Sequence, residues 1–545
     1  MRKVYVFAGI AGLLSAVACK DPLNVPNPNS PDAERALARP GDVEAIIGSS
    51  YNIAWQGTIG GQNDDVNNQL SVMSFENSSS LANFNMGTRG SLPRNPLNNQ
   101  KGNAGLVGNF WDFRTDARAA RSAADGIVQL NKPGFSIGSP QRDIRGRAFA
   151  YFVMGLGNGN TALAYDSGAV VTEFNGDANG ISIPYPSLLS HDSLMKLALK
   201  QLDSAQKYAS QMTIALDPAW IPSGTGLSAA QFGQLIHFWK ARFRAEVPRT
   251  VAERVAVNWT QVRDDALAGI TADIRTSMNP ANGWVIAWYI QHFSFDTWTQ
   301  QSPIMIGMAD SSGAYDAWLA LPITQRSAFL IRSADQRFPP GDTRAAQQAS
   351  SMTGGVQVPS RSNLYFRNRT ATDPSGEPYA NSYYDWYRYQ AFYNASRIGL
   401  FQMFQKAEND LLLAEAYYRL GDLASAAALI NNTRVANGNL PPLPATMTAT
   451  DPVPGGAACV PRVPDPATNY TSSKCGTLFE ALKWEKRMEL AFMQYGAWYF
   501  DSRGWGDLAL GTALEWPVPY QEMDTRSEPF YNQQGPGAPK GTYGY

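Results

Sequence analysis

Hydrophobic residues recur at helical spacing in several stretches of the chain. Near the N-terminal end, Val43, Ile46 and Ile47 indicate a helix within residues 32–50, which Asp42 can cap. The same spacing, with apolar positions three or four residues apart, predicts further amphipathic helices along the chain. These expected helices span residues 145–164, 192–205, 228–244, 259–270 and 478–495.

The clearest helical pair spans residues 407–437. Leu411 and Ala414 lie on the apolar face of its first helix, Gly421 and Asp422 form the turn, and Asp422 can cap the second helix. Small residues at a helix crossing and a Gly-Asp turn are typical of tetratricopeptide units, which bury their apolar faces only by stacking. The sequence therefore predicts a mainly α-helical fold: a tetratricopeptide-like scaffold of helical pairs, with long inserted loops and a few short strands.

Long stretches without a sustained period separate these helices. Residues 60–103 are rich in Asn, Gly and Ser, which predicts surface loops with short strands, and binding residues often lie on such loops. We predict a single domain over residues 32–545, with the helical scaffold at about 145–280 and 395–510. Residues 281–394 are predicted to form a variable insertion that faces the ligand.

The N-terminal residues have the pattern of an export signal. A basic start and an apolar stretch too short to span a membrane lead to small residues and then Cys19. A signal peptide over residues 1–18 that ends before Cys resembles a bacterial lipobox, so we predict that Cys19 is lipidated and anchors the chain by acyl chains. An ordinary signal peptide cleaved near Ala18 is the alternative. The Pro-rich residues 19–31 are predicted to form a flexible tether.

Composition narrows the possible functions. Lys and Arg number 45 and Asp and Glu 46, for a net charge of −1, so the basic excess that nucleic-acid binding needs is missing. Three His and three Cys disfavour a metal centre and His-based catalysis, and we predict no metal or cofactor. Cys459 and Cys475 lie in one loop rich in Pro, Gly and Thr, which in an exported protein predicts a disulfide.

Three segments carry a family resemblance. Residues 484–508 read WEKRMELAFMQYGAWYFDSRGWGDL, residues 407–443 contain the helical pair, and residues 249–270 read RTVAERVAVNWTQVRDDALAGI. Together with Cys19 and its tether, they resemble the SusD/RagB family of nutrient-binding outer-membrane lipoproteins. The chain departs from the family pattern after Phe492, where Met493-Gln494 replaces the usual Glu-Gly.

The resemblance implies a function and a partner. It implies a lipid-anchored outer-membrane protein facing the cell exterior, which binds oligosaccharides without catalysis and delivers them to a SusC-like TonB-dependent barrel. A peptide-binding member of the same uptake class and a secreted glycan-degrading enzyme are the alternatives. A paired-carboxylate mechanism has little support, because Glu485 and Glu489 lie on one helix face, where ion pairing with Lys486, Arg487 or a neighbouring helix is expected.

Candidate ligand-binding residues come from two aromatic segments and one loop. Sugars bury their C–H faces against flat aromatic rings, while Asn and Arg side chains bond their hydroxyls. Core packing and an interface with the barrel are alternative interpretations, since Trp and Tyr are enriched in both. The candidates are Trp284, Trp288, Tyr289 and Trp298 in the first segment, Tyr383 and Trp386 in the second, and Phe84, Asn85 and Arg89 in the loop.

Overall fold

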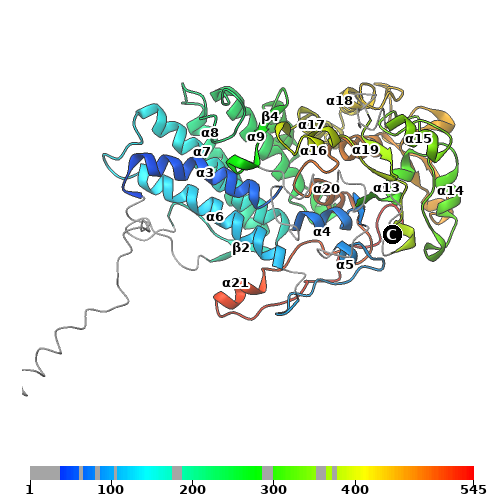
Figure 1. Cartoon of the computed structure of the whole chain (residues 1–545), viewed down its shortest axis with the longest axis horizontal. Coiled ribbons are helices and arrows are strands. Elements are labelled where there is room, and N and C mark those ends of the chain that lie inside the picture. Colours follow the sequence, from blue (N-terminus) through cyan, green and yellow to red (C-terminus); the bar gives the residue numbers. More distant parts are fainter. Residues whose placement is uncertain are drawn as a thin grey trace, which may run out of the picture.

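Helices dominate the computed structural model of the chain, and strands are few and short (Figure 1). This confirms the predicted fold class. The structure describes residues 37–59, 66–79, 86–103, 107–174, 187–284, 299–351, 364–370 and 377–545. Its α-helices are α3 (Pro40–Gln56), α4 (Val66–Met73), α5 (Met86–Gly90), α6 (Val107–Leu130), α7 (Pro140–Ala164), α8 (His191–Ala209), α9 (Ala229–Glu246), α10 (Val251–Val255), α11 (Trp259–Leu267), α13 (Pro303–Ile306), α14 (Ala314–Leu319), α15 (Arg344–Ser351), α16 (Gln390–Asn394), α17 (Lys406–Arg419), α18 (Leu423–Arg434), α19 (Leu478–Leu490), α20 (Ala497–Trp505) and α21 (Tyr520–Thr525).

The long helices pack on one another in a chain of neighbours. Helix α3 lies against α6, α6 against α7, α7 against α8, and α8 against α9; helix α11 then joins α9 to α17, which packs on α18 and α19. Small residues allow the helices from α3 to α9 to pack close to one another. A Cβ at Gly159 in α7 would lie 2.2 Å from the ring of Phe243 in α9, so only glycine fits there.

Local signals define most of the helix ends. Ser228 caps α9 through a capping box with Gln231, and Asp422 accepts a hydrogen bond from the backbone N–H of Ser425 at the start of α18. Two expectations were wrong. Helix α3 begins at Pro40, so Asp42 lies in its first turn rather than at its cap, and α19 ends at Leu490 rather than continuing to residue 495.

The strands form two-stranded antiparallel ribbons. The ribbon formed by residues 274–278 and 399–404 brings together the segments on either side of residues 281–394. The assignment of residues 281–394 as a ligand-facing insertion stays a prediction. The pairs are β1 (Asn77–Ser79) with β5 (Thr299–Gln301), β2 (Ser167–Ala169) with β3 (Leu188–Ser190), β4 (Ile274–Met278) with β8 (Gly399–Phe404), β6 (Phe366–Asn368) with β7 (Tyr384–Trp386), and β9 (Arg462–Pro464) with β10 (Ser473–Cys475).

A disulfide joins the β9–β10 region. Cys459 and Cys475, the two residues that the sequence predicts to be bridged, are bonded to each other, with their Cα atoms 5.8 Å apart. Cys19 and its tether lie outside the described residues, so lipidation stays a prediction. None of the described helices is both long enough and apolar enough to cross a membrane.

Candidate functional site

A cavity of about 340 Å³ opens between the segment after α4 and two distant parts of the chain. One wall comes from α4, β1 and α5, and the other from the start of α13 and the single turn at Pro378–Ala380. The register of β1 and β5, with Asn77 opposite Gln301, brings these walls together. The described residues that line the cavity are Val72, Phe75, Asn77, Ser78, Met86, Gly87, Thr88, Gly90, Ser91, Asn95, Ser302, Ile304, Glu377, Tyr379 and Ala380.

Phe75, at the start of the first wall, has an unusual backbone conformation. Its backbone has a φ of 61°, in the left-handed region that a bulky side chain rarely adopts. The Arg94 guanidinium lies 5.0 Å from the centre of its ring, and the ring of Tyr545, the last residue, lies 5.6 Å from it. In Figure 1 the C-terminus accordingly lies near α5. A non-glycine residue persists in this backbone conformation only where its surroundings fix it, which makes the wall a rigid one.

Tyr379 provides an aromatic ring on the opposite wall. Its hydroxyl oxygen accepts a hydrogen bond of 2.7 Å from the backbone N–H of Leu92, which ties the turn to the loop after α5. Burial raises the pKa of Tyr379 above its usual value, so the phenol is neutral at physiological pH. The cavity therefore combines two aromatic rings and Met86 with neutral amides and hydroxyls and one carboxylate, that of Glu377. This set of groups suits an uncharged ligand with both apolar and hydroxyl-bearing faces.

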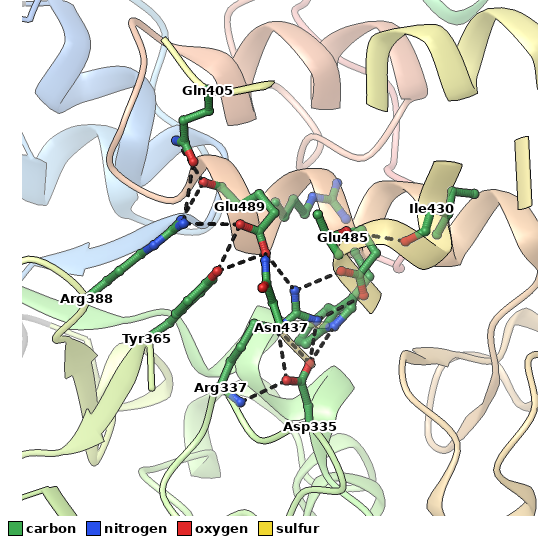
Figure 2. A network of polar contacts seen from close by, with 12 residues as sticks. Asp335, Arg337, Tyr365, Arg388, Gln405, Ile430, Asn437, Glu485 and Glu489 are labelled. Carbon is green, nitrogen blue, oxygen red and sulfur yellow. Dashed lines mark hydrogen bonds and ion pairs between the residues drawn. The ribbon is translucent and has the colours of Figure 1, made fainter. Parts of the chain in front are cut away.

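A buried network of charged groups lies where α19 meets the central segment of the chain (Figure 2). Arg337 is fully buried and donates to both oxygens of Glu485, at 2.9 and 3.0 Å, and to Asp335, at 2.6 Å. Tyr365 donates to both carboxylate oxygens of Glu489, at 3.0 and 2.9 Å. The expected ion pairing of Glu485 and Glu489 is present, although their partners come from far away in sequence rather than from Lys486 or Arg487.

The end of this network also supports both cavity walls. Arg388, a few residues after Tyr379, donates to the Glu489 carboxylate at 3.2 Å and to the Glu489 backbone carbonyl at 2.9 Å. Three residues further on, the Phe492 backbone N–H donates to the carboxylate of Glu76 at 2.6 Å. Glu76 directly precedes Asn77, so the chain from Glu489 to Phe492 is bonded to segments that lead into opposite walls.

Two of the predicted ligand residues are core residues in the structure. Trp284 is 6% exposed and packs 5.9 Å from the ring of Tyr51, and Trp386 is 1% exposed and packs 5.2 Å from the ring of Phe492. Neither residue lines the cavity, in line with the core-packing interpretation. Tyr383 is partly buried, with the Arg344 guanidinium 4.1 Å from the centre of its ring.

The loop prediction was closer to the cavity. Arg89 is itself 8% exposed, and its guanidinium donates to the carbonyls of Asn95 and Pro96 behind the wall. Its neighbours Asn77 and Met86 line the cavity, yet no motif in the sequence distinguishes them. Five candidate residues lie outside the described residues: Phe84, Asn85, Trp288, Tyr289 and Trp298.

Other chemistry has less support in the described part of the chain. There, no group of three or more His, Cys, Asp and Glu side chains is arranged to hold a metal ion. The carboxylates of Glu485 and Glu489 are buried and point toward Arg337 and Tyr365 (Figure 2), and neither residue lines the cavity.

Comparison with known proteins identifies the fold. No family model and no curated protein sequence matches the chain. A SusD superfamily protein from Bacteroides fragilis is similar to it with 13% identity and a TM-score of 0.50, over 89% of this chain and 97% of that one. A SusD-like carbohydrate binding protein from Bacteroides fragilis NCTC 9343 is similar with 12% identity and a TM-score of 0.50, over 86% and 87%. The chain thus has the SusD-like fold, as its sequence resemblance implies.

Proposed function

We propose that this chain is a cell-surface glycan-binding lipoprotein that captures oligosaccharides and delivers them to a SusC-like TonB-dependent outer-membrane transporter. The observation that carries the binding step is the cavity, which is lined by the aromatic residues Phe75 and Tyr379 together with neutral amide and hydroxyl groups. A similar structure described as a carbohydrate binding protein supports this choice of ligand. Lipid anchoring at Cys19 and delivery to a barrel follow from the resemblance of the sequence.

The chemistry of the cavity matches that of a sugar. A pyranose ring has apolar C–H faces, which pack on aromatic rings, and equatorial hydroxyls, which bond to amides such as that of Asn77 and to hydroxyls such as that of Ser302. A carrier that must release its cargo needs only moderate affinity. We expect dissociation constants between micromolar and millimolar, or about −8 to −4 kcal/mol.

The acidic residues of α19 support binding without turnover. Glycoside hydrolysis uses two carboxyl groups that flank the scissile bond. Glu485 and Glu489 are buried and bonded to Arg337, Arg388 and Tyr365, so neither reaches a bound sugar.

Calorimetry with a panel of neutral oligosaccharides tests the binding step. Tyr379→Ala removes a ring from the cavity and should weaken binding at least tenfold, whereas Tyr379→Phe keeps the ring and should cost less. Tyr208→Ala is the matched control, because Tyr208 lies partly buried on α8 and is not a lining residue. Failure of every glycan to bind would reject the proposal, and release of sugar products would contradict binding without turnover.

Fractionation of cells tests the anchor. Cys19→Ala should release the protein from the membrane fraction and abolish labelling by palmitate. A variant that still labels and still sediments with the outer membrane would exclude Cys19 as the lipidated residue.

A further inference from the structure

Asn77 places an unpartnered acceptor in the wall of the cavity. The residue is 2% exposed, and its side-chain oxygen Oδ1 has no hydrogen-bond partner. Its side-chain nitrogen has only a weak contact with the sulfur of Met86, at 3.9 Å. A buried polar group without a partner destabilises the protein, so a ligand that donates a hydrogen bond to Oδ1 supplies the partner that this oxygen lacks.

The described residues that line the cavity include no Lys, Arg or His to balance an anionic ligand. Glu377 is the one charged side chain among the described residues that line it, and it is exposed. Two arginines lie close by, but their donors are used elsewhere. Arg94 donates to the carbonyl of Met73 at 2.9 Å and to the hydroxyl of Thr512 at 3.1 Å.

Arg89 is used in the same way, since it donates to two backbone carbonyls behind the wall. Among the described residues that line the cavity, the charge is therefore the negative charge of Glu377.

We propose that the cavity selects uncharged glycans, with a sugar hydroxyl donating to Asn77 Oδ1, and rejects glycans that carry a carboxylate or sulfate at the bound sugar. This inference rests on the proposed function. A carboxylate or sulfate only accepts hydrogen bonds, so it leaves Asn77 Oδ1 unpaired and loses its water without gaining a cation. It also meets the negative charge of Glu377.

Matched ligand pairs test this selectivity. The probes are methyl-esterified and de-esterified oligogalacturonides, and cello-oligosaccharides with and without oxidation at C6, measured by calorimetry on the mature chain. Whichever backbone binds, the uncharged member should bind at least tenfold tighter than the charged one. Equal or tighter binding of the charged member would overturn the inference while leaving glycan binding intact. If neither member of any pair and no other glycan binds, the proposed function itself fails.

Two substitutions separate the effect of the Glu377 charge on binding from that of the Asn77 acceptor. Glu377→Gln should improve binding of the charged member about two- to fivefold, because an exposed charge acts weakly, and added salt should shrink this effect. Glu528→Gln is the matched control, an exposed acid that is not a lining residue. Asn77→Leu should weaken binding of the uncharged member at least tenfold while the melting temperature stays equal to or above that of the wild type. Uncharged ligands that bind normally to a folded Asn77→Leu protein would show that Asn77 plays no part in recognition.

Discussion

Removal of Arg337 should be among the most damaging single changes in the chain. Its guanidinium is buried and holds Asp335 at 2.6 Å and Glu485 at 2.9 Å, so Arg337→Met leaves two carboxylates buried without their cation. Methionine fills much of the volume, which limits the effect of lost packing. Breaking a buried ion pair from one side costs about 3–5 kcal/mol, and we expect the free energy of unfolding to fall by that amount at neutral pH.

The loss of unfolding free energy in Arg337→Met should depend on pH, and the pKa of Glu485 gives the direction. Burial already raises the pKa of Glu485 above its usual value, although Arg337 opposes the shift. Without Arg337 this pKa rises further. A carboxyl group whose pKa is higher in the folded than in the unfolded state loses stability as pH rises through the folded value. The variant should therefore lie closer to the wild type at about pH 5 than at about pH 8.

Urea denaturation followed by circular dichroism and tryptophan fluorescence measures this effect. Arg332→Met is the control, because Arg332 pairs with Asp342 at 3.3 Å where the two side chains are 56% and 81% exposed. Such exposed pairs contribute about 0–1 kcal/mol. A loss in Arg337→Met no larger than in this control, or a loss that grows toward low pH, would refute the reasoning.

Three further changes have defined outcomes. Burial raises the pKa of Glu408 to about 7, although Arg242 lies 3.5 Å away and opposes the shift. The contribution of Glu408 to wild-type stability should therefore fall as pH rises from about 4.5 to 7. Thermal melts across this pH range should show a flatter dependence of stability on pH for Glu408→Gln. Replacing Cys459 and Cys475 with Ala should lower the free energy of unfolding by about 3 kcal/mol relative to the oxidised wild type, as measured by urea denaturation. The reduced wild type should have the same free energy of unfolding as this variant. Ser228→Ala removes the cap of α9 and should cost about 1 kcal/mol in the same assay; no change would mean that Gln231 alone suffices.

Elements with strong local signals could be predicted from the sequence. The α17–α18 pair is one example, because a Gly-Asp turn and a cap by Asp422 determine where the helices end. Helix α6 was missed although it is 24 residues long. Phe113, Ile127 and Leu130 are buried near its two ends, but Asp116, Ala119 and Ala123 lie on the buried face between them. The large apolar side chains that mark a helix are therefore interrupted over its middle turns.

The candidate site was harder to predict because it depends on contacts between distant residues. The aromatic content of the segments around Trp284 and Trp386 suits a binding platform and a core equally well, and only tertiary packing separates the two. Asn77 has no motif around it. Its place in the cavity wall follows from pairing with Gln301, more than 200 residues away, which no local pattern specifies.

The charges of the C-terminal segment are used inside the protein. This explains how a strongly charged sequence motif coexists with a cavity in which Glu377 is the one charged side chain among the described lining residues. Glu485 and Glu489 are bonded to Arg337 and Arg388, while Lys486 pairs with Asp501 at 2.7 Å in the interior. Buried ion pairs add little net stability, but they tolerate few alternative geometries, since each unpaired charge would be costly. Here they fix the chain from Glu489 onward, to which both cavity walls are bonded. The motif therefore determines the shape of the site without contributing a charge to it, and ligand preference is left to the side chains of the walls.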